Sequence, residues 1–431
     1  MKLRSIQALS LRRNFSHMLI GNATYSLSQW GILISLAKLS STEAVGVYTL
    51  GIAVTAPIIL LTDLQLRTIL ATDAKKDYSF ENYLSLRVFM SMIAFLIIIF
   101  LLLMGGYDSH VSLIILLMGM TKIIETYCEI HYGFFQKHER MDLISRSLII
   151  RGLLSFLSVS FCIWVLDSLV SAVIGIGLSW LFVYLIVDRP SLVAFRQNTK
   201  IRYDKGLKKL LITAFPLGIV MMLSSLTTNI PRYFIEHYAG LEQLAYFSAL
   251  IYILFAGNIV INAFGQSASP RLASFYINGD FKKFLRLVFM LLSIGLFCGV
   301  IGYVIASIWG KQLLTIIYSS EYAAYQSVFT LLMFASILLY TSSFLGYILT
   351  SMRKFKIQPF LSLFWIVITI AVSALLIPKF GINGAAYVTI ATAAAQCLSL
   401  ATVIIYEVSK AQKATSIRYL QKRNIGGDVS G

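Results

Sequence analysis

Apolar runs of about 20 residues recur along the whole 431-residue chain, and short polar clusters separate them. Roughly 20 residues of α-helix cross a hydrocarbon layer about 30 Å thick, so each run is long enough to span a membrane. Hydrophobic residues make up 58% of the chain and charged residues only 13%, whereas a soluble protein carries about 25% charged residues. The sequence therefore predicts an all-α integral membrane protein whose main solvent is lipid.

The apolar runs predict twelve membrane-spanning helices. Their expected positions are 16–38, 43–62, 84–104, 111–134, 147–166, 168–187, 210–230, 244–266, 285–308, 325–350, 357–377 and 384–408. An even number places both termini on one side, and 31 of the 36 Lys and Arg residues fall on that side. Because basic residues are retained in the cytoplasm, we expect both termini there. Topology explains the net charge of +17 better than binding to nucleic acid.

A weak internal repeat predicts two six-helix halves. STEAVGVYTLGIAV aligns with GLEQLAYFSALIYI at an offset of 199 residues, and QKHERMD aligns with TSMRKFK at an offset of 214. The extra 15 residues fall in GQSASPRLASFYINGDFKKFLRLV, where we expect a longer cytoplasmic connection. The alternative is that short apolar motifs match by chance.

The repeat predicts an N-terminal lobe at 1–204 and a C-terminal lobe at 205–431, which ends in a short basic cytoplasmic tail. The segment at 188–209 holds seven Lys or Arg residues and is the expected linker between the lobes. Two interpretations of its charge are open. It lies on an anionic membrane surface, or it only keeps the segment in the cytoplasm.

The sequence contains no nucleophile motif, HExxH, P-loop or paired carboxylates. The predicted outer loops, such as GGYDSH, DSLVS and KFGING, are too short for a catalytic domain. The four cysteines lie far apart in apolar runs, without the spacing of a metal or redox site. We therefore expect a protein that is not an enzyme and that holds no metal and no cofactor.

Polar side chains within the predicted spans are candidates for a binding site, because lipid makes their burial costly. The first span carries Asn22, Tyr25, Ser26 and Gln29 on one helical face. The eighth span carries Asn258, Asn262 and Gln266 at successive steps of four residues. Stripes at matching places in the two halves predict a polar cleft for substrate between them. The alternative is hydrogen bonding that only holds the helices together.

The fourth predicted span carries the most charge, with Lys122, Glu125 and Glu129 on one face. Two interpretations stand side by side. A Lys122–Glu125 pair would lower the cost of burial and be purely structural. The same residues would also suit anion binding at Lys122 and titration of Glu125 or Glu129 in coupling to a proton or sodium gradient.

Two arginines near span ends are further candidates. For Arg151 we favour the interpretation that it extends along its apolar stem to the cytoplasmic surface. Arg232 follows Pro231 on the side that holds few basic residues, where its guanidinium would grip a phosphate. Pairing with Glu236 is the alternative for Arg232.

Three motifs resemble those of the polysaccharide transporter family, the Wzx-type O-antigen and capsule flippases. They are LTDLQLRTILATD after the second span, GQSASPRLASFYINGDFKKF after the eighth, and KFGINGAAYVTIATAAAQ at the last. The SPRLA stretch is fairly specific, the Gly-Ala-Ala entry to the last span is weak, and the resemblance extends in pattern over most of the chain.

The resemblance implies the fold of the multidrug, oligosaccharidyl-lipid and polysaccharide exporter (MOP) superfamily, which the MATE transporters share. In that fold two six-helix bundles form a V around a central cavity. Similar proteins move an undecaprenyl-diphosphate-linked oligosaccharide from the inner to the outer leaflet of the bacterial cytoplasmic membrane. By that analogy Arg67 and Arg271, in LQLRT and SPRLA, lie at the cytoplasmic mouth, and with Arg151 they form a gate or a diphosphate contact. The ordinary interpretation of these arginines is charge that keeps loops inside.

The lipid II flippase branch usually has extra C-terminal helices and a cavity lined by arginines, and this chain departs from both features. We therefore expect a flippase for O-antigen, capsule or exopolysaccharide synthesis that uses alternating access. Its partners are the lipid-linked oligosaccharide, membrane lipids and other assembly proteins. The alternatives are a cation-coupled multidrug exporter of the same fold and a non-transporting scaffold of a synthesis complex.

Overall fold

The computed structural model describes residues 9, 11–73, 78–195, 201, 205–352 and 354–426, and its regular elements there are all helices. Nine helical segments among these residues are long and apolar enough to cross a membrane. This confirms the predicted all-α membrane fold. The chain divides into two compact units, Met1–Tyr246 and Phe247–Gly431. The count of twelve spans, the side of the termini and the lobe boundary after residue 204 stay predictions.

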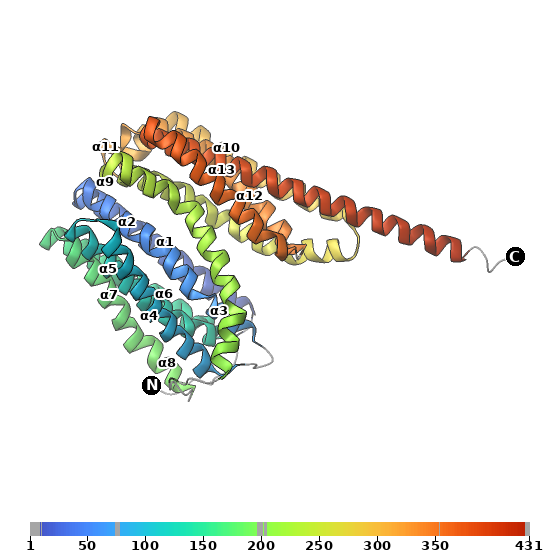
Figure 1. Cartoon of the computed structure of the whole chain (residues 1–431), viewed down its shortest axis with the longest axis horizontal. Coiled ribbons are helices and arrows are strands. Elements are labelled where there is room, and N and C mark those ends of the chain that lie inside the picture. The colour runs from blue at the N-terminus through green and yellow to red at the C-terminus, as the bar shows by residue number, and fades with distance from the viewer. Residues whose placement is uncertain are drawn as a thin grey trace. The chain divides into compact units, whose positions relative to one another are not determined.

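The first unit is a helical bundle arranged around α5 (Ser109–Lys137). Its other elements are α1 (Leu11–Leu39), α2 (Thr42–Asp63), α3 (Leu66–Thr72), α4 (Phe80–Gly105), α6 (Met141–Leu166), α7 (Leu169–Val183), a π-helical turn (Tyr184–Asp188), α8 (Arg189–Ala194) and the first part of α9 (Lys205–Ile277). Helix α5 packs against α2, α3, α4, α6 and α7, and Figure 1 shows the bundle in blue to green. Side chains on α5 therefore meet most of the unit.

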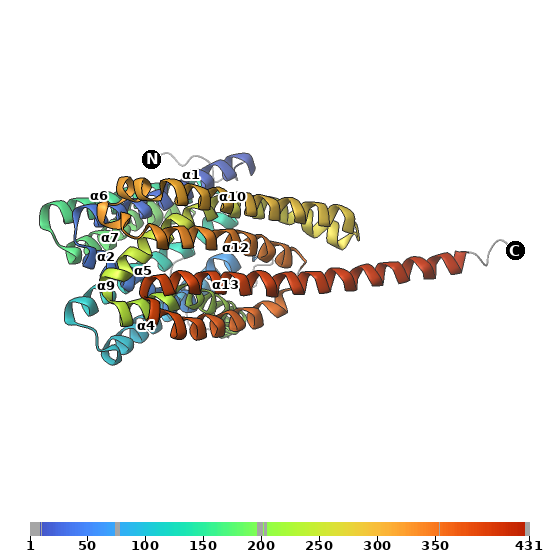
Figure 2. The same cartoon turned by 90° about the horizontal axis from the view of Figure 1, so that it is seen from above.

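The second unit contains the end of α9 together with α10, α12 and α13. Its elements after α9 are α10 (Phe281–Ile317), α11 (Ser320–Ala323), α12 (Gln326–Ser351), a 3-10 turn (Phe355–Ile357) and α13 (Gln358–Gly426). Helix α12 packs against both α10 and α13, around buried Phe284, Phe344 and Ile348. Figure 2 shows the C-terminal end of α13 projecting past the helices beside it.

One predicted connection is helical instead, because polar sequence alone does not end a helix. The expected long connection around SASPRLASFYINGD is helix α9 through Ile277, followed by a tight turn to α10 at Phe281. In that turn Gly279 has a φ of +73°, and the N–H of Asp280 donates to the carbonyl of Phe275, as in a glycine-terminated helix. Asp280 then caps α10, and its hydrogen bond from Lys283 lowers the pKa of the Asp280 carboxyl.

The turns recur at the spacing of the predicted repeat. Between α5 and α6 the N–H of Arg140 donates to the carbonyl of Phe135, and after α12 the N–H of Lys354 donates to that of Leu349. Both the donors and the acceptors are 214 residues apart. Such six-residue closures satisfy carbonyls at a helix end, so the two connections end their helices in the same way.

Positions of unusual backbone conformation recur too. Asp167, between α6 and α7, has a φ of +45°, and Gly381, where α13 breaks, has a φ of +54° at the same offset of 214. Helix α9 breaks at Gly240, which is 199 residues after Ser41, the residue that caps α2. These positions lie at helix ends or breaks at the two predicted offsets, and the internal repeat itself stays a prediction.

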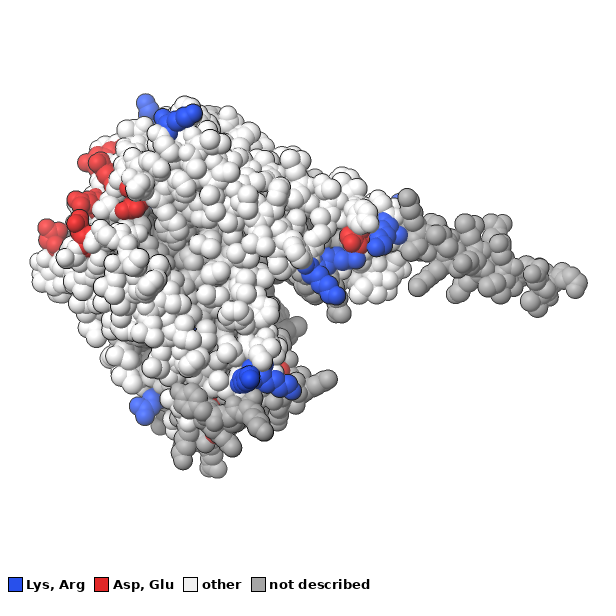
Figure 3. All heavy atoms as spheres, in the orientation of Figure 1, with Lys and Arg blue, Asp and Glu red and all other residues white. Residues whose placement is uncertain are grey.

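The surface has the composition expected of a lipid-facing protein. Large apolar side chains stand exposed on the spans, among them Leu103, Trp164 and Phe360 at 80%, 76% and 71% exposure. Uncharged atoms cover most of the face in Figure 3, and its Lys, Arg, Asp and Glu side chains lie in small groups near the margins. Lipid rather than water suits such a surface.

Close packing in the first unit makes a test of this fold possible. A Cβ added at Gly46 of α2 would lie 2.1 Å from the carbonyl oxygen of Leu241, whereas one at Gly346 of α12 meets nothing within 4 Å. We expect Gly46→Ala to lower the free energy of unfolding by about 1–3 kcal/mol through overpacking. Gly346→Ala, the matched control, should leave stability unchanged or raise it. Thermal unfolding of the purified protein measures both, and equal effects would contradict the packing of α2.

Candidate functional site

A linked set of polar side chains joins α5 to α1 inside the first unit. The Lys122 ammonium lies 2.7 Å from a carboxylate oxygen of Glu125, and the Tyr25 hydroxyl donates to the other oxygen at 2.8 Å. Lys122 also lies 5.3 Å from the ring centre of Trp180 on α7. The Lys122–Glu125 pair weighed from the sequence is therefore present, and it shares Glu125 with the polar face of α1.

Arg151 on α6 forms a buried ion pair with Asp188. Its guanidinium lies 3.3 Å from the carboxylate, and the two side chains are 1% and 0% exposed. The π-helical turn Tyr184–Asp188 ends at this carboxylate, and such turns are frequent at functional sites. The expectation that Arg151 reaches the cytoplasmic surface was wrong, because its side chain is buried against Asp188. Burying the Asp188 carboxylate without a cation would be costly.

Aromatic rings complete the surroundings of Arg151. Its guanidinium lies 5.4 Å from the ring centres of both Tyr132 and Trp180. The Trp180 indole donates to the Ser155 hydroxyl at 2.8 Å, and that hydroxyl donates to the Arg151 carbonyl at 2.7 Å. Cation–π contacts of this kind add to the ion pair when the cation is desolvated. The Asp188 carboxylate and the rings of Tyr132 and Trp180 thus surround the Arg151 guanidinium.

A second buried ion pair joins α4 to the end of α2. Arg87, 1% exposed, donates to the Asp63 carboxylate at 2.6 Å and to the Asp63 carbonyl at 2.9 Å. It also donates to the Thr62 carbonyl, and so satisfies carbonyls that the end of α2 leaves open. Sequence reasoning counted Arg87 and Arg151 among the cytoplasmic loop charges and missed Asp63 and Asp188. The sequence signal for these two ion pairs was an acidic residue at the end of each of two apolar runs.

A polar cavity of about 330 Å³ opens beside this pair. It is lined by Asp63, Gln65, Arg67, Thr68, Glu129 and Gln136. The Arg67 guanidinium lies 3.7 Å from a carboxylate oxygen of Glu129 and 5.5 Å from the ring centre of Tyr132. Two candidates from the sequence, Arg67 and Glu129, therefore meet here. Glu129 pairs with α3 rather than with Lys122.

The backbone between α2 and α3 brings Arg67 to this cavity. Leu64 and Gln65 both adopt the left-handed conformation, with φ values of +54° and +53°. Residues other than glycine rarely adopt the left-handed backbone conformation, and such strained positions cluster at functional sites. Helix α3 also crosses α5 closely, because a Cβ at Gly133 would lie 2.9 Å from the Arg67 carbonyl oxygen.

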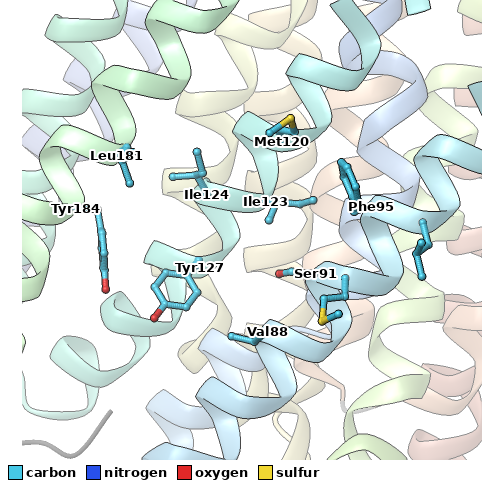
Figure 4. A pocket seen from close by; sticks show the side chains of 11 residues that line it. Val88, Ser91, Phe95, Met120, Ile123, Ile124, Tyr127, Leu181 and Tyr184 are labelled. Atoms are coloured by element: carbon cyan, nitrogen blue, oxygen red, sulfur yellow. The ribbon is translucent and has the colours of Figure 1, made fainter. Parts of the chain in front are cut away.

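An apolar groove of about 680 Å³ lies on a different face of α5 (Figure 4). It is lined by Val88, Ser91, Met92, Phe95, Leu96, Met120, Ile123, Ile124, Tyr127, Leu181 and Tyr184. The Tyr127 and Tyr184 rings lie 5.4 Å apart, edge to face, and Figure 4 shows them on one side of the groove. No side chain in this lining carries a charge. The groove therefore offers contact for hydrocarbon.

The remaining candidates of the first unit are two amides on α1 and one arginine on α9. Asn22 is exposed, and Gln29 keeps a buried amide nitrogen without a hydrogen-bond partner in the described part of the chain. Arg232 of α9 is buried at 5% exposure and donates to the Asn229 side chain at 2.9 Å. A substrate role for these three residues stays a prediction.

The candidates of the second unit lie on α9. Asn262 is exposed and accepts a hydrogen bond from the Tyr347 hydroxyl at 3.2 Å. The Asn258 side-chain oxygen is buried and has no hydrogen-bond partner among the described residues. Arg271 is exposed, and the Gln266 side chain lies outside the described residues. The cleft predicted between the two stripes also stays a prediction.

Comparisons with known proteins define the class. An inward-facing multidrug resistance MATE family transporter of the MOP superfamily matches with a TM-score of 0.74 and 13% identity, over 92% of this chain and 99% of that one. The lipid II flippase MurJ, in an inward closed conformation, matches with a TM-score of 0.73 and 14% identity, over 93% and 90%. The chain has the fold of these two multi-pass membrane proteins, which confirms the predicted MATE-like fold.

Sequence comparison gives the family. Residues 11–276 match the family described as polysaccharide biosynthesis protein, and the chain belongs to that family. The capsular polysaccharide biosynthesis protein CapF of Staphylococcus aureus is 29% identical over 378 residues, which are 87% of this chain and 94% of that protein. The predicted resemblance to a family of polysaccharide biosynthesis is confirmed.

The Arg151–Asp188 pair makes a direct test of the first unit. We expect Arg151→Leu to lower the free energy of unfolding by about 3–5 kcal/mol, because it leaves the Asp188 carboxylate buried without its cation. The double variant Arg151→Leu with Asp188→Leu should regain most of that loss. Arg271→Leu, at an exposed arginine, is the matched control and should change little. Chemical denaturation measures the three variants beside the wild-type protein, and a double variant no more stable than Arg151→Leu would refute the buried pair.

Proposed function

We propose that this protein is a flippase that moves an undecaprenyl-diphosphate-linked oligosaccharide from the inner to the outer leaflet of the bacterial cytoplasmic membrane. The product would feed the synthesis of O-antigen, capsule or exopolysaccharide. The observation that carries the proposal is the row of Lys122, Glu125 and Glu129 on α5, held inside an apolar bundle and bonded to α1 and α3. Charge within a membrane span marks a substrate or ion pathway, and the family and fold supply the class of substrate.

The physical problem for such a substrate is its headgroup. Each hydroxyl moved into hydrocarbon without a hydrogen-bond partner costs several kcal/mol, and each unpaired phosphate charge costs far more. In the proposed mechanism the sugar and the diphosphate enter a hydrated passage while the prenyl tail stays in lipid. The two units then expose that passage on alternate sides of the membrane.

We assign roles to the polar side chains on this basis. Lys122 and Arg232 attract the diphosphate, and Arg271 contributes to a cytoplasmic gate. The side chains proposed to hydrogen-bond sugar hydroxyls are Asn22, Gln29, Asn258, Asn262 and Gln266. Hydrogen bonding to a ligand fits Asn258 and Gln29, because each has a buried polar atom without a partner in the described part of the chain.

Direction would come from an ion gradient that acts at Glu125. Its carboxylate accepts hydrogen bonds from both Lys122 and Tyr25, so a proton or a sodium ion at Glu125 would change contacts on α1 and α5 together. A bistable contact of this kind is what couples a local charge to a larger motion. Other polysaccharide-assembly proteins in the same membrane are the proposed partners that remove the product.

The two alternatives predict different features. A cation-coupled multidrug exporter needs an apolar, aromatic site with an acidic residue, and the lining of the apolar groove contains no carboxylate. A non-transporting scaffold needs no charge in its spans, whereas burial of the α5 row carries a cost in free energy. Both observations favour the flippase.

Deletion of the gene tests the proposal in cells. We expect surface polysaccharide to be lost and its lipid-linked intermediate to accumulate in the inner leaflet, because the headgroup does not cross lipid unaided. Unchanged polysaccharide together with altered drug resistance would contradict the flippase and support a multidrug exporter. The surface polysaccharide and the lipid-linked intermediate are extracted and measured by gel and mass analysis.

Complementation with point variants separates a flippase from a scaffold. We expect Lys122→Leu, Arg232→Leu and Asn262→Leu each to lower export at least about tenfold, the effect of roughly 1.4 kcal/mol in binding. Lys379→Leu, at an exposed lysine, is the matched control and should restore export. Membrane levels of each variant are compared in the same samples. Full export by all three variants at normal levels would support the scaffold instead.

A further inference from the structure

The lining of the polar cavity suits a neutral ligand that is rich in hydroxyls. Carboxylates of Asp63 and Glu129 accept hydrogen bonds, the Arg67 guanidinium donates them, and the amides of Gln65 and Gln136 do both. A sugar ring presents neighbouring hydroxyls that donate and accept at once. Cavities that bind small molecules select them by a few placed polar groups of this kind.

The cavity has room for a sugar ring. It offers about 330 Å³ of space to the centres of water-sized groups, and one water needs about 10–15 Å³ of such space. One pyranose ring, with about 12 non-hydrogen atoms, therefore fits there, and further sugars would extend from the open side.

The charges argue against a diphosphate in the same place. The Asp63 carboxylate already lies 2.6 Å from Arg87, and the Glu129 carboxylate lies 3.7 Å from Arg67. Each carboxylate in the lining thus has its own cation, and the lining residues hold no surplus positive charge. A diphosphate would face two carboxylates at close range, where like charges repel strongly.

The Arg67–Glu129 pair leaves hydrogen-bonding capacity for a hydroxyl. At 3.7 Å these two groups stand beyond ordinary hydrogen-bond length, in contrast to the 2.7 Å of Lys122 and Glu125. A hydroxyl on the cavity side of the pair would donate to Glu129 and accept from Arg67. The left-handed turn at Leu64 and Gln65 is held by the buried side chains of Leu64 and Leu66, so the wall is positioned before a ligand arrives.

We infer that this cavity is a subsite for one sugar ring of the transported headgroup, bound through its hydroxyls by Gln65, Arg67, Glu129 and Gln136. The inference rests on the proposed function, since it names what part of that substrate the cavity holds. It moves Arg67 from a gate or diphosphate contact to a sugar contact. The diphosphate then lies elsewhere in the passage.

Binding of matched lipids to the full chain in lipid nanodiscs tests the subsite. The probes are undecaprenyl diphosphate alone and the same lipid carrying one N-acetylglucosamine, one glucose or one galactose. We expect at least one sugar to raise affinity about tenfold over the bare lipid in the wild-type protein. Gln136→Leu and the nearly isosteric Glu129→Gln should abolish that gain, and Gln136→Leu, which removes no charge, should leave the affinity for the bare lipid unchanged. Gln358→Leu in the second unit is the matched control and should keep the gain.

Each other outcome overturns the inference in a distinguishable way. Equal loss of affinity for bare and sugar-bearing lipids in Gln136→Leu and Glu129→Gln would place the diphosphate in the cavity. Wild-type protein that binds every probe equally well would reject a sugar subsite and leave the proposed function intact. Wild-type protein that binds none of the four lipids would reject the proposed function itself, and the subsite with it.

Discussion

The first unit depends on opposite charges that meet inside helices solvated by lipid. Arg87 with Asp63 links α4 to α2, and Arg151 with Asp188 links α6 to the π-helical turn. Lys122 pairs with Glu125 within α5, and the Tyr25 hydroxyl joins that carboxylate to α1. Breaking a buried pair is costly while forming one gains little. Such pairs therefore specify how helices are placed more than they stabilise the fold. With the neighbouring helices placed in this way, α5 can carry polar side chains within the membrane-spanning part of the bundle.

Two kinds of environment result on opposite sides of the same helix. One face of α5 meets ion pairs, tyrosine hydroxyls and the polar cavity, and another face lines the apolar groove with Met120, Ile123 and Tyr127. A lipid-linked glycan has the same division, with a hydrophilic head on a hydrocarbon tail. Polar chemistry suits the head, and the lipid around the unit suits the tail.

Much of the fold was predictable from the sequence, because membrane spans are recognised by their length and apolar composition. Helix ends were less predictable. GQSASPRLASFYINGD looks like a loop, yet it remains helical to Ile277 and turns at Gly279, which needs no long connection. The predicted repeat is weak in side chains, and the i to i−5 closures at Arg140 and Lys354 are the matching feature of the backbone.

The candidate site was predictable in part. Helical periodicity placed Lys122, Glu125 and Glu129 on one face, and the structure leaves them half-buried, each beside an opposite charge. Counting basic residues could not separate Arg87 and Arg151 from charges that set topology, because their partners lie 24 and 37 residues away. The polar cavity depends on two left-handed residues that have no signature in sequence.

The central claim is that this polar path carries a glycan headgroup across the membrane, and movement of the lipid itself is its most direct measure. The purified chain would be placed in liposomes with an undecaprenyl-diphosphate-linked oligosaccharide, and the glycan reaching the outer face would be followed with an added glycosidase. The account predicts glycan that crosses over time at a rate well above that of protein-free liposomes, and that crosses at least about tenfold more slowly with Lys122→Leu. Crossing at the protein-free rate with the wild-type chain would contradict it.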